Sequence, residues 1–202
     1  GYTYASSIED IGEYNGNGYV ILNDNKTYFT DIEKENTNSY QKFSELDLLG
    51  RCGVAEANIS YDMMPTKERE SIGMIKPSGW HTVKYDIVDG KYLYNRCHLI
   101  GYQLTGENAN PLNLITCTRQ MNTKSMLEFE NKVSKYIKET NNHVLYRVTP
   151  IFKDTDLVAY GVEIEAYSVE DNGKGIEFNV FIYNVQDGIN INYHDGESSL
   201  IG

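Results

Sequence analysis

The feature that most constrains the fold is the change of periodicity near residue 141. Residues 122–140 carry apolar side chains at helical spacing, whereas the three runs that follow alternate as strands do. These runs comprise residues 144–151, 157–167 and 176–185. Because they succeed one another without an intervening helix, they predict an antiparallel meander, and the chain as a whole is expected to be α+β.

Shorter elements are expected before the long helix. Two hairpins are predicted, one at residues 19–29 around an Asn-Asp-Asn-Lys loop and one at residues 80–94 around Asp89-Gly90. The second hairpin puts residues 96–98 just past its second strand. A loop at residues 106–111 and a short apolar strand at residues 112–116 then lead to the helix. With 202 residues the chain is expected to form one domain, residues 1–202, with a central antiparallel sheet flanked by helices.

The net charge of −11 by itself argues against a polyanionic ligand. The charge is unevenly distributed, however, because residues 51–153 carry fourteen Lys and Arg against ten Asp and Glu. The two flanking segments are strongly acidic. Since the local field steers a charged ligand, the middle segment can still attract an anion. Taken alone, this excess of basic residues is more simply explained as a solvated surface.

A motif in the basic segment favours the binding of an anion over a merely solvated surface. In the run YNRCHL at residues 94–99, Arg96 and His98 are two positions apart, so in an extended strand both side chains point to the same side. They could address one phosphate together, Arg96 by bidentate contact and His98 as a base. Asn122, near the start of the helix, could give one oxygen to a Mg²⁺ ion that keeps most of its waters, although helix capping is the alternative role. A base, a cation and a metal ligand suit the hydrolysis of a phosphodiester.

The predicted helix carries one acidic residue toward its apolar side. Its main apolar residues span an arc of about 100°, and measured from Met126, Asn122 lies at about −40° and Glu130 at about +40°, in or beside this arc. A carboxylate turned toward a core is costly unless it is paired or serves a charge. Helical side chains lean toward the N-terminus, so Glu130 can hold a water bound to the same metal as Asn122. The alternative is an ordinary ion pair with a lysine or arginine.

The three cysteines, Cys52, Cys97 and Cys117, are too few for a disulfide scaffold. One bridge with a free thiol, for which Cys52–Cys97 is a candidate pair, and three free thiols both remain open. A zinc site is disfavoured because no C-x₂₋₄-C pair occurs. Cys97 and His98 are adjacent and face opposite sides of an extended chain, so they make a poor thiol–imidazole dyad.

Residues 94–122 resemble the DNA/RNA non-specific endonuclease family, whose sites have a ββα-metal arrangement. The runs LDLLGRCGVA at residues 46–55 and KPSGW at residues 76–80 are similar to the extracellular DNases of streptococci, the streptodornase type, as are residues 95–108 and 113–122. The similarity extends from about residue 46 to near residue 185. The family's D-R-G-H signature is N-R-C-H here, a form that the streptococcal branch tolerates. Cys117 replaces the glycine of an I-T-G-T pattern, where a tight turn would be strained.

The resemblance implies a role for each candidate residue. His98 would be the general base, Asn122 the direct Mg²⁺ ligand, Asn113 a support for the site, Glu130 the holder of a metal-bound water, and Arg96 a phosphate contact. A further phosphate-binding arginine is expected upstream, with Arg69 the first choice and Arg51 the second, and Arg119 is another candidate for substrate binding. Mg²⁺ is the expected metal, with Mn²⁺ or Ca²⁺ as alternatives.

The function expected from these features is that of a secreted, sequence-non-specific endonuclease with a ββα-metal core at about residues 80–140. It would cleave DNA, with RNA as an alternative substrate, and leave 5′-phosphate products. We expect a monomer that is extracellular or bound at the cell surface, and no apolar run approaches the roughly 18 residues of a membrane span. The alternatives are a secreted nucleic-acid-binding or host-interaction protein without catalysis, and a phosphodiesterase acting on small nucleotides or lipids.

Overall fold

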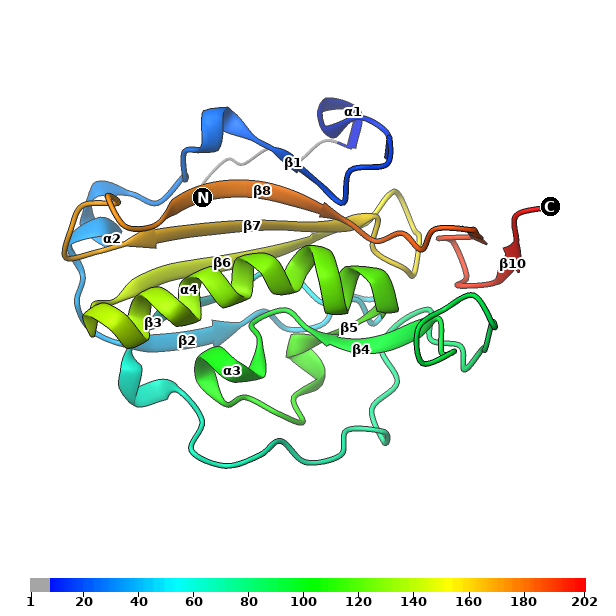
Figure 1. The fold of residues 1–202 in the computed structure, drawn as a ribbon, viewed down its shortest axis with the longest axis horizontal. Coiled ribbons are helices and arrows are strands. Elements are labelled where there is room, and N and C mark those ends of the chain that lie inside the picture. Colours follow the sequence, from blue (N-terminus) through cyan, green and yellow to red (C-terminus); the bar gives the residue numbers. More distant parts are fainter. Residues whose placement is uncertain (1–7) are drawn as a thin grey trace.

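The centre of the molecule is a six-stranded antiparallel sheet with the strand order β1-β8-β7-β6-β3-β2 (Figure 1). The computed structural model describes residues 8–202. The strands of this sheet are β1 (Tyr19–Ile21), β2 (Tyr40–Phe43), β3 (Ala55–Ile59), β6 (Val144–Ile151), β7 (Gly161–Ser168) and β8 (Glu177–Tyr183). Strands β6, β7 and β8 pair in sequence order, with Val144 opposite Ser168 and Gly161 opposite Tyr183. The predicted meander and the α+β class are therefore confirmed.

The long helix α4 (Met126–Thr140) crosses one face of this sheet (Figure 1). Its buried side chains Phe129, Val133 and Ile137 share one apolar cluster with inward-facing residues of the strands. The helix ends at Asn141, whose left-handed conformation (φ 58°) lets its N–H bond the Ile137 carbonyl. This packing fixes the face of α4 and therefore the direction in which its first residues point.

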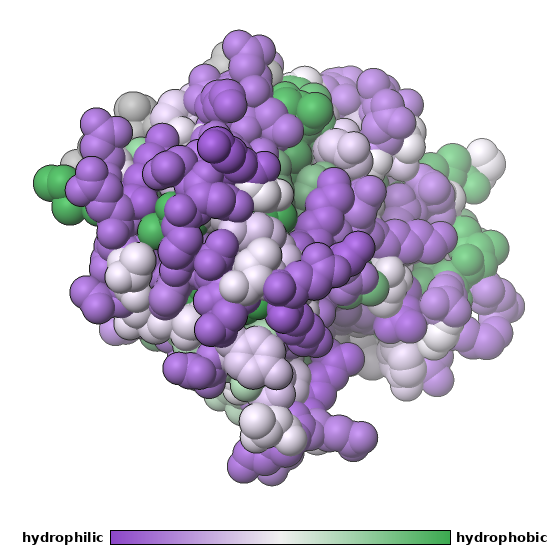
Figure 2. Space-filling view, turned by 60° about the vertical axis from the view of Figure 1, so that its left-hand side comes forward, coloured by the Kyte–Doolittle hydropathy of each residue, from purple (hydrophilic) through white to green (hydrophobic). Residues whose placement is uncertain are grey.

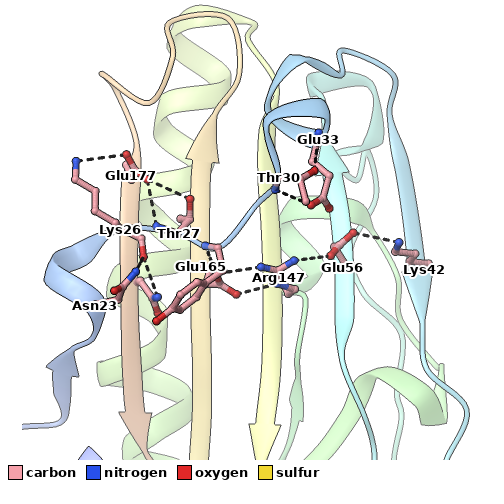
Figure 3. Close-up of polar contacts among 12 residues, drawn as sticks. Asn23, Lys26, Thr27, Thr30, Glu33, Lys42, Glu56, Arg147, Glu165 and Glu177 are labelled. Atoms are coloured by element: carbon pink, nitrogen blue, oxygen red, sulfur yellow. Dashed lines mark hydrogen bonds and ion pairs between the residues drawn. The ribbon is translucent and has the colours of Figure 1, made fainter. Parts of the chain in front are cut away.

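The opposite face of the sheet carries a chain of ion pairs that is buried at Arg147 and reaches the exposed Lys42 (Figure 3). Arg147 on β6 contacts Glu165 on β7 at 2.8 Å and Glu56 on β3 at 3.2 Å, and Glu56 also contacts Lys42 on β2 at 3.3 Å. The segment before β2 covers this network, since the Arg147 guanidinium lies 4.3 Å from the ring centroid of Phe29. Because both faces are covered, all eight residues of β6 and all eight of β7 are buried.

The predicted opening hairpin is wrong. β1 pairs with β8, with Tyr19 opposite Ile182, and residues 27–29 form no strand. Thr27 instead bonds the Glu177 carboxylate through its N–H and hydroxyl, and the Tyr28 N–H donates to Glu165. The connecting residues 23–25 all have positive φ and form the short helix η1 (Asn23–Asn25), followed by α2 (Asp31–Glu35).

A second layer is built from the hairpin of β4 (Tyr94–His98) and β5 (Leu114–Thr118), in which His98 lies opposite Leu114. Arg96 and His98 thus lie within a strand rather than past one. The expected hairpin at residues 80–94 is reduced to a single bridge between Lys84 and Tyr92. The remaining elements are α1 (Ile8–Ile11), η2 (Tyr61–Met63), α3 (Tyr102–Thr105), η3 (Pro111–Asn113), η4 (Met121–Ser125), β9 (Ile189–Ile191) and β10 (Ser198–Leu200).

The face of the molecule shown in Figure 2 is mostly hydrophilic, and hydrophobic side chains appear there only in small separate groups. Within residues 8–202, no helix combines the length and the apolar character that crossing a bilayer requires.

Candidate functional site

Most of the candidate residues converge where the β4–β5 hairpin meets the start of α4. A cavity of about 690 Å³ at this place is lined by His98, Asn122, Glu130, Arg69 and Arg119, among others. A neighbouring cavity of about 530 Å³ shares Arg69, Arg119 and Asn122 with the first and adds Arg96 and Trp80. The imidazole at the end of the hairpin and the amide on the following helical turn therefore face one common space.

His98, the last residue of β4, is buried, and its Nε2 lies 2.9 Å from the carbonyl oxygen of Asn108. A carbonyl can only accept, so Nε2 carries the hydrogen and Nδ1 is the free nitrogen of a neutral ring. Burial lowers the pKa of His98, and the Arg69 cation lowers it further, against the opposing effect of the Asn108 contact. The ring is thus held neutral at pH 7, as a proton acceptor must be.

Asn122 lies inside the π-helical turn η4, an irregularity that is frequent at functional sites, and does not cap the helix. Its Nδ2 donates to Asn95 Oδ1 at 3.0 Å, and Arg119 Nη1 reaches the same oxygen at 3.4 Å. Asn95 is therefore an acceptor that orients the Asn122 amide and leaves Asn122 Oδ1 as the atom without an N–H partner. Sequence reasoning missed this role of Asn95. The only sign of it in the sequence is that Asn95 stands where the D-R-G-H signature has aspartate.

Glu130 is buried on the side of α4 that faces this cavity, as the helix geometry predicts. In the described part of the chain, no hydrogen bond or ion pair involves its carboxylate, so the alternative of a simple ion pair is not observed. The carboxylate lies against Gly101, where a Cβ atom would collide with Glu130 Oε2, so a side chain at this position would displace the carboxylate. Burial raises the pKa of Glu130 to about 8, although the Arg69 cation opposes the shift.

Arg69 lies on a loop whose backbone is fixed on both sides of it. The Lys67 carbonyl accepts from the Tyr102 hydroxyl at 2.7 Å, and the Glu70 carbonyl accepts from Asn108 Nδ2 at 3.1 Å. The Arg69 side chain is exposed, and within residues 8–202 no hydrogen bond or ion pair holds its guanidinium. It is available to an anion that enters either cavity.

Arg96 lies apart from His98, in the neighbouring cavity. Its guanidinium donates to the carbonyls of Ile75 and, at 3.0 Å, Gly73, and stacks over the Trp80 ring with its carbon 4.0 Å from the centroid. The spacing of Arg96 and His98 therefore does not bring both side chains to one cavity. In this arrangement Arg96 anchors residues 73–80 to β4.

Arg51 and Asn113 do not line either cavity. Arg51 stays a prediction as a substrate-binding residue, and its guanidinium pairs with Asp47 at 2.8 Å and donates to the carbonyls of Asp154 and Asp156. Asn113 is fully buried and makes two hydrogen bonds, of 2.9 and 3.0 Å, with the backbone of Ile100. It thus holds the chain that follows His98.

Cys97 is bridged to Cys117, with their Cα atoms 5.7 Å apart, and Cys52 is a buried free thiol. The candidate pair Cys52–Cys97 is wrong because Cys97, opposite Ile115 in the β4–β5 pairing, is bridged to the diagonally placed Cys117 instead. Cys117 lies within β5 and is not among the residues with positive φ, so the strained turn considered for it is not present.

The donor atoms of the large cavity suit a hydrated magnesium ion. Asn122 Oδ1 and the unpaired Glu130 carboxylate are hard oxygen ligands, and such an ion keeps several of its waters. Within residues 8–202, no cluster of three or more His, Cys, Asp or Glu side chains could enclose a metal on its own. A zinc site built from nitrogen and sulfur ligands fits this cavity less well.

The sequence and the fold of this chain are similar to those of known proteins. The family described as DNA/RNA non-specific endonuclease matches residues 30–170. NucA from Streptococcus agalactiae without metal is 29% identical with a TM-score of 0.81, covering 96% of this chain and 92% of that one. Its magnesium-bound form is 28% identical with a TM-score of 0.80, covering 100% and 90%. The Sda1 nuclease with bound zinc is 26% identical with a TM-score of 0.74, covering 97% and 99%. The chain thus belongs to the DNA/RNA non-specific endonuclease family, with streptococcal NucA among its structural neighbours.

Proposed function

We propose that this protein is a single-domain, secreted, divalent-metal-dependent endonuclease that hydrolyses DNA, with RNA as a second substrate, and leaves 5′-phosphate ends. The observation that carries the proposal is that one cavity is lined by a neutral buried histidine, an oriented amide oxygen and an unpaired carboxylate. Family membership and the NucA and Sda1 neighbours support the nuclease assignment. The Cys97–Cys117 bridge supports an oxidising, extracellular location.

In the proposed mechanism, His98 Nδ1 removes a proton from a water molecule that attacks phosphorus opposite the leaving 3′ oxygen. The Asn108 carbonyl keeps the ring in the tautomer that exposes Nδ1. Arg69 and Arg119 line the cavity and bind the non-bridging oxygens of the phosphate. Arg96 contributes to phosphate binding mainly through the loop that it holds.

Asn122 Oδ1 would hold the metal ion, and the Glu130 carboxylate would hold one of the waters bound to it. When bound, the cation stabilises negative charge on the scissile phosphate and on the departing oxygen. Asn95 orients the Asn122 amide so that its oxygen faces the cation. Magnesium is the metal that we propose, on the basis of the oxygen ligands, with Mn²⁺ and Ca²⁺ as substitutes. The magnesium-bound form of NucA supports a divalent cation at this type of site.

The test is degradation of plasmid DNA by purified wild-type protein and by His98→Ala, Asn122→Ala and His194→Ala. The wild type is expected to cleave with Mg²⁺ and not with excess EDTA. His98→Ala should lose at least about 100-fold in rate, because general-base catalysis contributes on this order. Asn122→Ala should lose activity together with its stimulation by Mg²⁺. His194→Ala is the histidine control, because its side chain is exposed and lines neither cavity.

Cleavage by His98→Ala at the wild-type rate would reject the histidine as the base. A wild-type protein that binds DNA but never cleaves it would favour the non-catalytic binding protein. Cleavage of a dinucleotide without cleavage of plasmid would favour a phosphodiesterase of small substrates. Circular dichroism spectra of all variants verify that the fold is kept.

A further inference from the structure

The Cys97–Cys117 bridge lies directly beside the amide that we propose as a metal ligand. Cys97 Sγ is 3.2 Å from Asn122 Oδ1, and both cysteines are fully buried. Cys97 also immediately precedes His98 in β4. The sulfur therefore contacts the one Asn122 atom that the Asn95 contact leaves without an N–H partner.

The chemistry of this contact depends on the oxidation state of Cys97. A bridged sulfur carries no hydrogen, so it cannot donate to Asn122 Oδ1, and the oxygen keeps its lone pairs for another partner. A thiol at the same place carries an S–H group, and 3.2 Å is within the distance at which sulfur donates to oxygen. Such a hydrogen bond would occupy the oxygen that a cation needs.

We propose that the Cys97–Cys117 bridge is a positioning element of the metal site, which keeps Asn122 Oδ1 free for the cation, and that its reduction weakens cation binding. The inference rests on the proposed function, because it takes Asn122 as the ligand. In the reduction, the Sγ–Sγ bond breaks and a dithiol reductant supplies two electrons and two protons. Each cysteine becomes a thiol, and the reductant becomes a disulfide.

Because both sulfurs are buried, the oxidation state of Cys97 and Cys117 depends on when a reductant can reach them. A reductant can reach the bridge only if the hairpin opens locally, so the oxidation state is established mainly as the chain folds. A chain that folds among reducing thiols would have a weakened metal site. A chain that folds in an oxidising environment would have the full site. The bridge would thus link metal binding by this nuclease to the compartment in which it folds.

A matched pair of variants separates this role from simple stiffening of the hairpin. Cys97→Ala and Cys117→Ala both remove the cross-link, but only Cys117→Ala leaves a thiol facing Asn122. Both are made in a Cys52→Ala background, which prevents mispairing and itself keeps the bridge. The readout is the affinity for Mn²⁺, measured from the electron paramagnetic resonance signal of the free ion in the absence of DNA.

We expect Cys117→Ala to bind Mn²⁺ about two- to fivefold more weakly than Cys97→Ala, the range that a weak S–H···O bond supplies. Cys97→Ala should bind nearly as well as the bridged background, and adding reductant should change neither variant. Equal affinities of the two variants would overturn the proposal, because a merely structural bridge is lost equally in both. If alanine at either position prevents folding, the same comparison is made with Cys97→Val and Cys117→Val.

Asn122→Ala in the same background separates this inference from the proposed function. If Asn122→Ala loses Mn²⁺ affinity while the two cysteine variants remain equal, only the role of the bridge is wrong. If Asn122→Ala binds Mn²⁺ as the background does, the ligand assignment fails and the inference fails with it.

Discussion

His98 and Glu130 face the same cavity, and burial shifts their pKa values in opposite directions. Removal from water disfavours the charged form of any group. The imidazole therefore stays neutral and ready to accept a proton, while the carboxyl tends to hold one. The Arg69 cation reinforces the first effect and opposes the second. Arg69 thus lowers the pKa of both groups in the absence of substrate.

The pH dependence of cleavage should reflect the lowered pKa of His98. A base acts only when unprotonated, and a pKa below the ordinary value of 6.5 keeps it unprotonated to lower pH. We therefore expect the acid limb of kcat/KM, measured from about pH 4.5 to 8 at saturating Mg²⁺, to have its midpoint below 6.5. A midpoint at or above 6.5 would contradict this environment for His98. A circular dichroism spectrum that stays unchanged across this pH range excludes acid unfolding as the cause.

Glu130→Gln should stabilise the metal-free protein while it impairs catalysis. The pKa of Glu130 is raised from 4.5 to about 8, so the folded state retains a proton that the unfolded state releases. Stability contributed by the neutral carboxyl is therefore complete below about pH 4.5 and is lost as the pH rises toward 8. At pH 7 the penalty is about 3 kcal/mol, and glutamine removes it.

Urea unfolding in EDTA at pH 5 and pH 8 measures this effect. Glu130→Gln should gain stability over the wild type at pH 8 and little at pH 5. Glu128→Gln, an exposed position on the same helix, is the control and should show no such difference. An equal change in the free energy of unfolding at both pH values would mean that burial does not raise the pKa of the Glu130 carboxyl.

The sequence could predict site residues whose position follows from one helix or strand. Glu130 and Asn122 follow from the helical arc, and His98 follows from the end of a strand. The roles of Asn108 and Asn95 could not be predicted, because each depends on how a separate loop or turn closes on the site. The contacts of Arg51 could not be predicted for the same reason, since its three acceptors lie on loops whose approach the sequence does not reveal.

At the scale of elements, the loop at residues 64–93 carries Arg69 to the cavity, and Arg96 anchors that loop to β4. Arg96→Lys should loosen it, because lysine lacks the planar fork that bonds two carbonyls and stacks on Trp80. We expect faster tryptic cleavage at Lys67, Arg69 and Lys76, and a KM for DNA that rises more than kcat falls.

The control is Arg51→Lys, which changes an anchor of a different loop. It should leave the rate of cleavage at these three sites unchanged. If Arg96→Lys is cut at the wild-type rate and loses kcat with an unchanged KM, Arg96 acts on the transition state directly. That result would support the phosphate contact that the resemblance implies for Arg96.

Elements with a strong local pattern could be predicted, and those defined by distant partners could not. α4 and strands β6 to β8 show their periodicity within the segment itself. β1 pairs with β8, more than 150 residues away, so the nearby run at residues 27–29 is a misleading partner. That run donates hydrogen bonds to the carboxylates of the buried Glu165 and the partly buried Glu177, which cannot be inferred from alternation.

At the scale of the whole molecule, negative charge and substrate-binding charge are separated. Three of the buried acidic residues, Glu56, Glu163 and Glu165, lie on the face of the sheet away from α4, where Arg147 pairs with two of them. Arg69 and Arg119 line the cavity on the other side. A protein with a net charge of −11 can therefore present two arginines to a phosphate at this cavity, which Glu68 and Glu130 also line, at the cost of long-range repulsion.

This separation predicts a shallow but measurable dependence of DNA binding on salt. Each phosphate contact to duplex DNA contributes about −0.9 to the slope of log affinity against log salt concentration, so Arg69 and Arg119 together predict a slope of about −2. Arg69→Gln and Arg119→Gln should each reduce its magnitude by about 1. The measurement is fluorescence anisotropy of a labelled duplex with the His98→Ala protein, at a fixed Mg²⁺ concentration. Lys174→Gln, an exposed change in the acidic C-terminal segment, should leave the slope unchanged. A slope that neither arginine substitution alters would show that DNA contacts the protein elsewhere.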